Sequence, residues 1–320
     1  MPGLRARLAH ALDRRFAALG VRVDAVRTEI DAERARTEDL TAAVGRIADE
    51  LGVVRERVDA RVLPLLRAVA FEDAELRRRL DALRDDPDYE AAWTDPDPLV
   101  TVCISAVPER VELLAGRALP SALAQTHPDV EVVVVGDGFD PLADPRLAPL
   151  AGDGVRFGMV TQRMVQPGAR REWLTAATLA SNEARRMARG RWLTELDDDD
   201  VLRPGAVAAL LAHARTTQAE VTYGLIERHD PAGAPGEVLG GFPPEPIGDW
   251  DGPALPYWRG RASSAALVHS GLRFIGRRHV SGDLGVPGDQ FLVEQMVRAG
   301  VRFAFVDDVV YDYFPGGPPG

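Results

Sequence analysis

Four consecutive aspartates, Asp197 to Asp200, are the strongest sign of chemistry in the sequence. Adjacent carboxylates repel one another, and a bound divalent cation removes that repulsion. In an extended or turning backbone alternate residues point the same way, so Asp197 and Asp199 can face one ligand while Asp198 faces another. Such oxygen ligands suit Mg²⁺ or Mn²⁺. A solvated acidic turn before Pro204 would carry the same residues, so the cluster alone leaves both interpretations open.

The segments around the cluster alternate between strand and helix patterns. The buried-strand patterns are LVTVCISAV (99–107), VEVVVVGDG (130–138), VRFGMV (155–160) and RWLTEL (191–196), and the helix patterns are 110–125, 172–189 and 205–217. This alternation predicts an α/β fold with a mostly parallel central sheet and helices on both faces. Ligands of such sheets bind beyond the carboxyl ends of the strands. Asp137 and the acidic cluster both follow a strand there.

Residues 1–85 have a different pattern, which is typical of a coiled-coil-like helical region. Apolar residues alternate at steps of four and three: Leu12, Phe16, Leu19, Val23, Val26, Ile30, Leu40, Val44, Ile47, Leu51, Val54, Val58 and Leu65. Homo-oligomerisation through 1–85 and a helical hairpin folded against the same chain both remain open. The acidic, proline-rich segment 86–97 is predicted to be a linker to a catalytic domain at 98–314. Residues 315–320 are predicted to be a disordered tail.

Composition narrows the class of protein. A formal charge of −11 argues against nucleic-acid binding, which normally needs a basic surface. The sequence has no lysine, so phosphate must be bound by arginine, backbone amides or metal. The single cysteine, Cys103, lies in an apolar run and indicates core. No transmembrane run or signal-peptide pattern occurs, so we expect a cytoplasmic protein that can meet a membrane-linked acceptor peripherally, at the inner face.

Four motifs, taken together, resemble family 2 glycosyltransferases. ASNEARRMARGRWLTELDDDDVLRPGAV (180–207) is similar to the family's helix, strand and aspartate cluster. PLVTVCISAV (98–107), SALAQTHPDVEVVVVGDG (121–138) and GDQFLVEQMVRAG (288–300) are similar to its first strand, its second strand and its later acidic motif. The resemblance covers about residues 98–312 and implies a GT-A fold.

The resemblance also implies a donor site for a nucleoside diphosphate sugar. Asp137 would contact the nucleotide base, in a pocket lined by Ser105 and Val107, and Arg171 would approach the base or the diphosphate. Gly136 stands where the family usually has a further aspartate. A UDP-sugar is therefore favoured by family frequency alone, and guanine and thymine nucleotides stay open. Trp258 could stack on a sugar face, although core packing is the ordinary role of one tryptophan.

In the same way, the resemblance implies the catalytic roles. Asp197 and Asp199 would form the DxD motif, with Asp199 the direct ligand of Mn²⁺ or Mg²⁺, Asp198 near the ribose or sugar, and Asp200 only shaping the turn. Asp289 would be the general base, although an aspartate at the start of a helix is commonly an N-cap.

With one base and no second nucleophile, we expect an inverting transfer to a hydroxyl acceptor in glycan, polysaccharide or glycoconjugate synthesis. The alternative is a non-catalytic nucleotide-sugar-binding or scaffold protein. A nucleotidyltransferase is disfavoured because SAVPERVE (105–112) lacks a glycine-rich phosphate loop.

Overall fold

The computed structural model describes residues 2–152, 154–163, 175–230, 233–239, 265–279 and 288–315. The chain forms two compact units, Met1–Phe71 and Glu72–Gly320. The site residues Arg171 and Trp258 and the tail beyond Pro315 lie outside the described residues.

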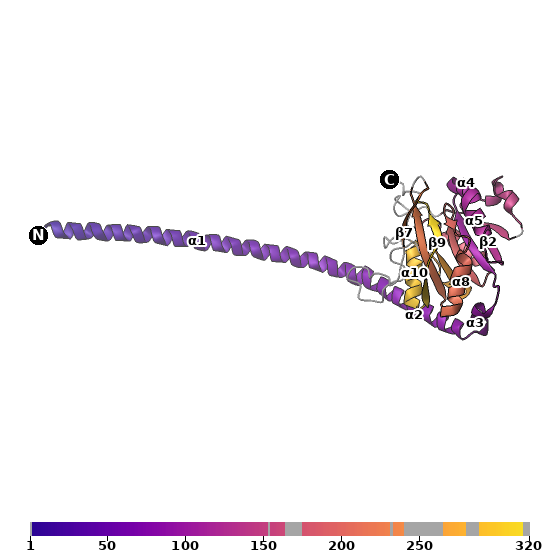
Figure 1. The fold of residues 1–320 in the computed structure, drawn as a ribbon. Helices are drawn as coiled ribbons and strands as arrows, with labels where there is room; N and C mark the ends of the chain where they lie inside the picture. The colour runs from indigo at the N-terminus through magenta and orange to yellow at the C-terminus, as the bar shows by residue number, and fades with distance from the viewer. Residues whose placement is uncertain are drawn as a thin grey trace. The chain divides into compact units, whose positions relative to one another are not determined.

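The first unit is helical throughout its described length (Figure 1). Helix α1 (Pro2–Arg57) runs into a π-helical turn, η1 (Val58–Val62), and then into α2 (Leu63–Arg84), which begins in this unit and ends in the second. The π turn lies just before Pro64, whose ring and missing N–H disturb the regular hydrogen-bond ladder. The segment is thus one long helix and not the hairpin that we considered. No helix among the described residues has the length and apolar character needed to cross a membrane.

A single mixed sheet forms the centre of the second unit. Its strands are β1 (Val100–Ala106), β2 (Val130–Asp137), β3 (Val155–Val160), β4 (Trp192–Asp197), β5 (Val201–Leu202), β6 (Val221–His229), β7 (Pro235–Leu239), β8 (Ala266–His269) and β9 (Phe303–Tyr313). The order is β3-β2-β1-β4-β8-β6-β9-β5, and β7 pairs with β6. Strands β3, β2, β1 and β4 are parallel, as are β6 and β9, whereas β8, β7 and β5 pair antiparallel to their neighbours. The predicted α/β class is confirmed, with the parallel pairing concentrated in the first half of the sheet.

Helices cover both faces of this sheet. One face packs against the run α4 (Val111–Leu113), η3 (Leu114–Ala118) and α5 (Leu119–Leu123), and against α8 (Ala206–Thr217). The other face packs against α7 (Thr178–Met187) in its first half, and against α10 (Gly288–Ala299) and the end of α2 in its second half. Because β1 and β2 are buried on both faces, they need the continuous Val/Ile runs seen in the sequence.

The segment that we predicted as a linker, 86–97, instead contains part of the core. Helix α3 (Pro87–Thr94) begins at the N-cap Asp86, whose side chain accepts a hydrogen bond from the Asp88 amide, and it buries Tyr89 and Trp93. Pro87 is suited to the first helical position because its fixed φ matches a helix and no hydrogen bond to its nitrogen is needed there. The acidic and proline residues that indicated a linker are therefore helix-start residues.

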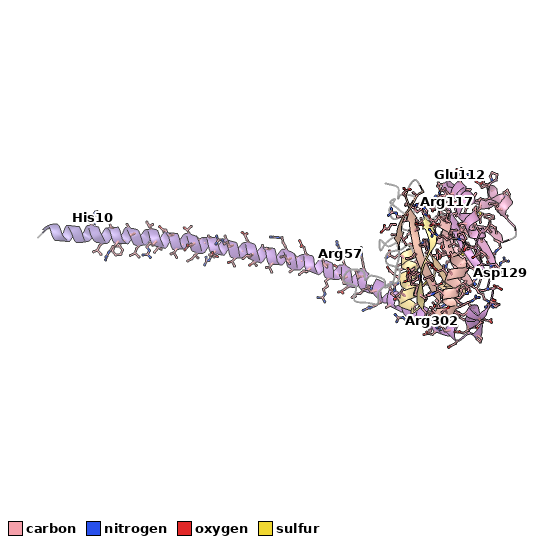
Figure 2. All side chains as sticks on the ribbon, viewed as in Figure 1. His10, Arg57, Glu112, Arg117, Asp129 and Arg302 are labelled. Atoms are coloured by element: carbon pink, nitrogen blue, oxygen red, sulfur yellow. The ribbon has the colours of Figure 1, made fainter. Side chains whose placement is uncertain are left out.

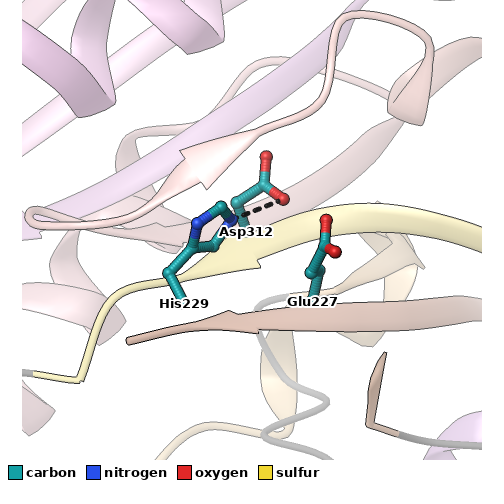
Figure 3. A group of neighbouring side chains, drawn as sticks. All are labelled: Glu227, His229 and Asp312. Carbon is teal, nitrogen blue, oxygen red and sulfur yellow. Dashed lines mark hydrogen bonds and ion pairs between the residues drawn. The ribbon is translucent and has the colours of Figure 1, made fainter. Parts of the chain in front are cut away.

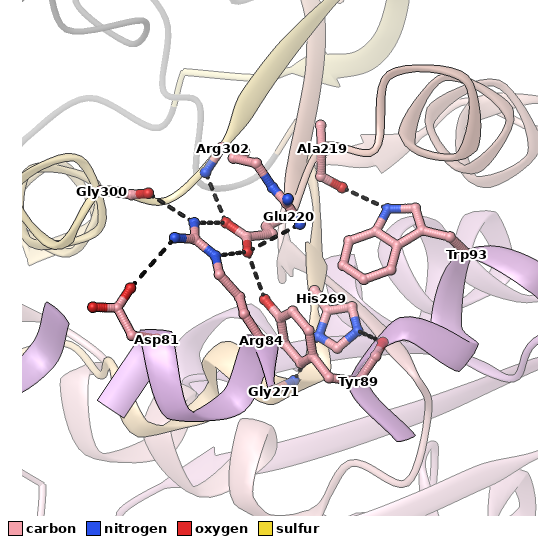
Figure 4. Close-up of polar contacts among 10 residues, drawn as sticks. All are labelled: Asp81, Arg84, Tyr89, Trp93, Ala219, Glu220, His269, Gly271, Gly300 and Arg302. Carbon is pink, nitrogen blue, oxygen red and sulfur yellow. Dashed lines mark hydrogen bonds and ion pairs between the residues drawn. The ribbon is translucent and has the colours of Figure 1, made fainter. Parts of the chain in front are cut away.

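Polar contacts fix this segment to the sheet around a buried carboxylate, Glu220 (Figure 4). Arg84 donates two hydrogen bonds to its carboxylate oxygens at 2.7 and 2.8 Å, and the Tyr89 hydroxyl donates a third at 3.0 Å. The Arg302 amide donates a fourth at 2.8 Å. The Trp93 indole N–H donates to the carbonyl oxygen of Ala219, the preceding residue. The end of α2 and α3 thus belong to the same folded unit as the sheet.

Candidate functional site

The acidic cluster lies where β4 ends, at the carboxyl edge of the parallel strands. Asp197 is the last residue of β4 and pairs in register with Ser105 of β1, while Asp198 and Asp199 form the turn that follows. Asp198, Asp199 and Asp200 are buried, with 3%, 7% and 1% of their surface exposed. Burial of three adjacent carboxylates rules out the solvated acidic turn that the sequence left open.

Two of these carboxylates share one arginine. The Arg110 Nη1 atom lies 3.2 Å from Asp198 Oδ1 and 2.9 Å from Asp199 Oδ2. The other Asp198 oxygen accepts a hydrogen bond from the Val107 amide at 2.9 Å. A second arginine, Arg117, donates to the Asp199 carbonyl oxygen at 2.8 Å. Neither arginine was predicted from the sequence; the only signal for Arg110 is its place four residues after the end of β1.

The fourth aspartate has a structural role. Asp200 accepts hydrogen bonds from the Tyr311 hydroxyl at 2.9 Å and from the Phe314 amide at 2.8 Å. The same Tyr311 oxygen accepts a hydrogen bond from the Asp197 amide at 3.1 Å. These contacts join the turn to the end of β9.

The site carries more negative charge than its arginines offset. Burial raises the pKa of Asp198 to about 7, with the charges of Asp199 and Asp197 adding to the effect. Burial likewise raises the pKa of Asp200 to about 8, and the charge of Asp197 adds to it. A divalent cation would relieve this excess, so the residues present fit one. Asp197 and Asp199 are the carboxylates that would hold it, because Asp200 is engaged by β9.

Asp137 ends strand β2, which is separated from β4 by β1, and is 4% exposed. Its Oδ1 atom is buried and has no hydrogen-bond partner among the described residues, and burial raises the pKa of the carboxyl group. A buried acceptor without a donor is costly, so it fits an N–H donor on a ligand. At Gly136, just before it, an added Cβ would lie 2.2 Å from the Phe139 carbonyl oxygen. That contact explains the departure from the family's aspartate at this position.

Asp289 lies in the first turn of α10, partly exposed, directly after Gly288. Arg277 connects it electrostatically with the acidic cluster. Burial lowers the pKa of Arg277, but the charges of Glu195, Asp289 and Asp197 outweigh that effect and raise it. The Arg277 backbone is held by Asn182 of α7, which donates to its carbonyl oxygen and accepts from its amide, both at 2.9 Å. Arg277 thus interacts with both the predicted base and a predicted metal ligand.

A second polar group lies beyond Asp200, between β6 and β9. In the described part of the chain, the one set of three metal-ligand side chains with atoms within 4.8 Å of one another is Glu227, His229 and Asp312 (Figure 3). Arg203 forms ion pairs with both carboxylates, and His229 Nε2 lies 3.1 Å from Asp312 Oδ1. Arg203 offsets one of the two carboxylate charges, and His229 would offset the other when protonated, so the contacts are those of an ion-pair cluster.

Comparisons with known proteins agree with the motifs. The family model "Glycosyl transferase family 2" matches residues 168–247, which include the whole acidic cluster. The succinoglycan biosynthesis protein ExoO of Rhizobium meliloti (strain 1021) is 31% identical over 127 residues, covering 40% of this chain and 33% of that protein. The resemblance to family 2 glycosyltransferases is therefore confirmed for this part of the sequence. The chain spans about a third of the length of this relative.

Solved structures similar to the chain include two of S. aureus TarS 1–349. The complex with UDP is 16% identical, with a TM-score of 0.47 over 68% of this chain and 60% of that chain. The complex with UDP-GlcNAc is 15% identical, with a TM-score of 0.47 over 68% and 59%.

Proposed function

We propose that this chain is a metal-dependent, inverting glycosyltransferase that moves a sugar from a nucleoside diphosphate sugar to a hydroxyl acceptor. The observation that carries the proposal is the charge-excess turn at Asp197–Asp199, where Asp198 and Asp199 are buried, together with the buried Asp137 Oδ1, which has no hydrogen-bond partner among the described residues, at the end of the next-but-one strand. The family match over 168–247 supports it. A role in glycan synthesis is supported by the name of the relative that acts in succinoglycan biosynthesis.

The donor nucleotide would bind across the ends of β1 and β2. Asp137 would accept a hydrogen bond from an N–H of the base, which uracil, guanine and thymine all possess, and we favour UDP. Ser105 and Val107, at the end of β1, would line this pocket. Asp198, fixed by the Val107 amide, would accept hydrogen bonds from ribose or donor-sugar hydroxyls. Arg171 and Trp258 remain predictions for the diphosphate and the sugar face.

Asp197 and Asp199 would hold Mn²⁺ or Mg²⁺ at the donor diphosphate. A bound divalent cation would act as a Lewis acid and offset the negative charge that develops on the leaving group. Arg110 offers a guanidinium at the same carboxylates, and Arg117 fixes the backbone of Asp199. The chain thus supplies two carboxylate ligands, a common number for Mg²⁺ sites that are completed by water and phosphate.

Asp289 would take the proton from the acceptor hydroxyl as its oxygen attacks the anomeric carbon. The bond from that carbon to the diphosphate oxygen breaks in the same displacement, and the configuration inverts. Arg277 forms its ion pair with Glu195, and the charges of Asp289 and Asp197 also help to raise its pKa.

Thermal unfolding with UDP, GDP or dTDP, with and without Mn²⁺, tests this function. A nucleotide at a hundredfold excess over its Kd stabilises by about 2.7 kcal/mol, which is roughly 5–10 °C for a unit of this size. We expect that shift only with metal, and its loss in Asp199→Asn. Asp307→Asn, at an exposed aspartate on β9, is the matched control.

Hydrolysis of a panel of nucleotide sugars would then identify the donor. If no nucleotide raises the melting temperature in the presence of metal, and Asp199→Asn behaves like the parent chain, the enzyme proposal fails and the scaffold alternative stands.

A further inference from the structure

Helix α1 carries a row of exposed apolar side chains that no described residue of its own unit covers. We define the seam as the heptad positions a and d of α1 from Phe16, an a position, to Val54, a d position. Its apolar side chains are 50–68% exposed, although each is of a type that normally packs. Figure 2 shows side chains projecting from α1 along its length between His10 and Arg57. A contiguous exposed apolar row of this length indicates an interaction surface.

The heptad register runs through the seam without a shift. Steps of three and four alternate from Phe16 to Val54, and the helix continues through Gly20, Gly45 and Gly52. A strict seven-residue repeat keeps an apolar stripe facing one partner only if two helices wind around each other. A globular partner would require no such repeat. The periodicity therefore favours another long helix with the same repeat, and a second copy of α1 has it.

Charges beside the seam specify how two copies would align. In a parallel, in-register pair each g residue faces the e residue five positions later on the partner. Glu29 would then face Arg34 of the other copy and Glu50 would face Arg55, whereas Arg22 would face Arg27, so two attractive pairings stand against one repulsive pairing. An antiparallel pair would bring e positions against e positions, and the charged ones are all arginine. Charge complementarity thus favours the parallel, in-register arrangement, in which attractive pairings outnumber the repulsive one.

The side chains within the seam indicate how many helices the coiled coil contains. The a positions are mainly β-branched, as at Val23, Ile30 and Val44, and the d positions include Leu19 and Leu40. β-Branched residues at a with leucine at d favour two-stranded coiled coils. We propose that α1 forms a parallel, in-register, two-stranded coiled coil with a second copy of this chain. This pairing does not depend on the proposed sugar transfer.

The seam also contains a polar layer, which lowers the stability of the paired helices. Glu33 at d and Thr37 at a interrupt the apolar row, and Glu33 is paired within its own helix with Arg36 at 2.7 Å. In register, the two Glu33 side chains face each other, which costs stability. The polar layer also opposes shifted registers, because a shift by one heptad would place each glutamate against an apolar position.

Adjacent valines of α1 provide a matched test in the full-length protein. Val54 lies in the seam at d and Val53 outside it at c, and they are 54% and 48% exposed. Val54→Asp and Val53→Asp make the same chemical change with the same effect on helix propensity. By sedimentation equilibrium we expect a dimer for the parent chain, a dimer dissociation constant raised at least tenfold in Val54→Asp, and no change in Val53→Asp.

Two further variants test the strength of the dimer and the relative orientation of its two helices. Glu33→Leu should lower the dimer dissociation constant at least tenfold. Val54→Cys, near one end of the seam, should form an interchain disulfide on mild oxidation only if the copies are parallel and in register, because antiparallel copies place the two cysteines at opposite ends. The parent chain, with its buried Cys103, is the control.

A parent chain that is monomeric at all concentrations would overturn the proposal. So would a trimer, equal dissociation constants for the two aspartate variants, or the absence of the Val54→Cys disulfide in a dimer. A nucleotide-dependent thermal shift that survives in Val54→Asp would show that loss of pairing and loss of donor binding are separate outcomes.

Discussion

The position at which the second unit begins gives the sharpest test of the fold. The resemblance to known transferases starts at about residue 98, whereas the compact unit starts at Glu72. We predict that residues 72–320 fold independently and that residues 98–320 do not. The difference between the two versions is residues 72–97, which comprise the end of α2 and all of α3.

The expected loss follows from the side chains that residues 72–97 bury. Leu76, Leu80, Tyr89 and Trp93 are at most 4% exposed in the second unit. Burying one such side chain contributes about 1.5–3 kcal/mol, so the four contribute roughly 6–12 kcal/mol. A whole domain is stable by only about 5–15 kcal/mol. The shorter version would also leave the buried carboxylate of Glu220 without two of its donors, which adds to the loss.

Thermal and urea unfolding of the two versions, followed by far-UV circular dichroism, is the assay. We expect a cooperative transition for 72–320 and none for 98–320. Leu80→Ala in the full chain is a milder test of the same packing, and we expect it to lower the free energy of unfolding of the second unit by about 2–5 kcal/mol. Leu66→Ala, at a position 57% exposed, should change the stability of the second unit by nothing measurable. The reasoning is refuted if 98–320 unfolds cooperatively within a few degrees of 72–320.

Three further predictions concern single residues. Burial lowers the pKa of His269 to about 4, so between pH 6.5 and 4 the unfolded state binds a proton that the folded state does not. The free energy of unfolding therefore falls as the pH drops through that window, by at most about 1.4 kcal/mol per pH unit. Urea unfolding at pH 7, 6 and 5 should show a shallower fall for His269→Phe than for the parent chain, and an equal fall would contradict this. Gly136→Ala should cost about 1–3 kcal/mol through its clash with the Phe139 carbonyl, whereas Gly116→Ala, where an added Cβ meets nothing within 4 Å, should be neutral or stabilising in thermal unfolding. Arg110→Met should strengthen Mn²⁺ binding, measured by calorimetry, roughly two- to fivefold, because the half-exposed guanidinium and the ion neutralise the same carboxylates; weaker binding would show that Arg110 supports the metal.

The sequence predicted the first half of the sheet well for a definite physical reason. Strands β1 and β2 are buried on both faces, so their apolar runs are continuous and their ends agree within one residue with the predicted 99–107 and 130–138. The later strands β6 and β8 pair antiparallel across the chain, and no local pattern encodes that partnership. Helix α3 was missed because its capping Asp86 was counted with the acidic residues of a linker.

Site residues on strands could be predicted, while those fixed by the tertiary structure could not. Asp137 and the acidic cluster were identified because they follow buried strands. Arg110 and Arg277 lie on connections, and their importance appears only when folding brings them to Asp198–Asp199 and to Glu195.

Charge balance separates two groups of buried carboxylates in this lysine-free chain. Burial raises the pKa of Glu195, but Arg277 and Arg185 outweigh it and hold the value at about 2. Burial acts in the same sense on Glu220, and hydrogen bonds led by that of Arg84 lower its pKa below the usual range.

At the carboxyl edge of the sheet the balance reverses. Burial dominates at Asp137 and Asp198, and the pKa of each is raised although arginines lie nearby. Glu195 and Glu220 are neutralised by arginines of the chain, whereas the carboxyl edge of the sheet keeps an excess of negative charge. That edge is therefore suited to bind positive charge or hydrogen-bond donors from outside the chain. A metal ion and the N–H groups of a nucleotide base are ligands of that kind.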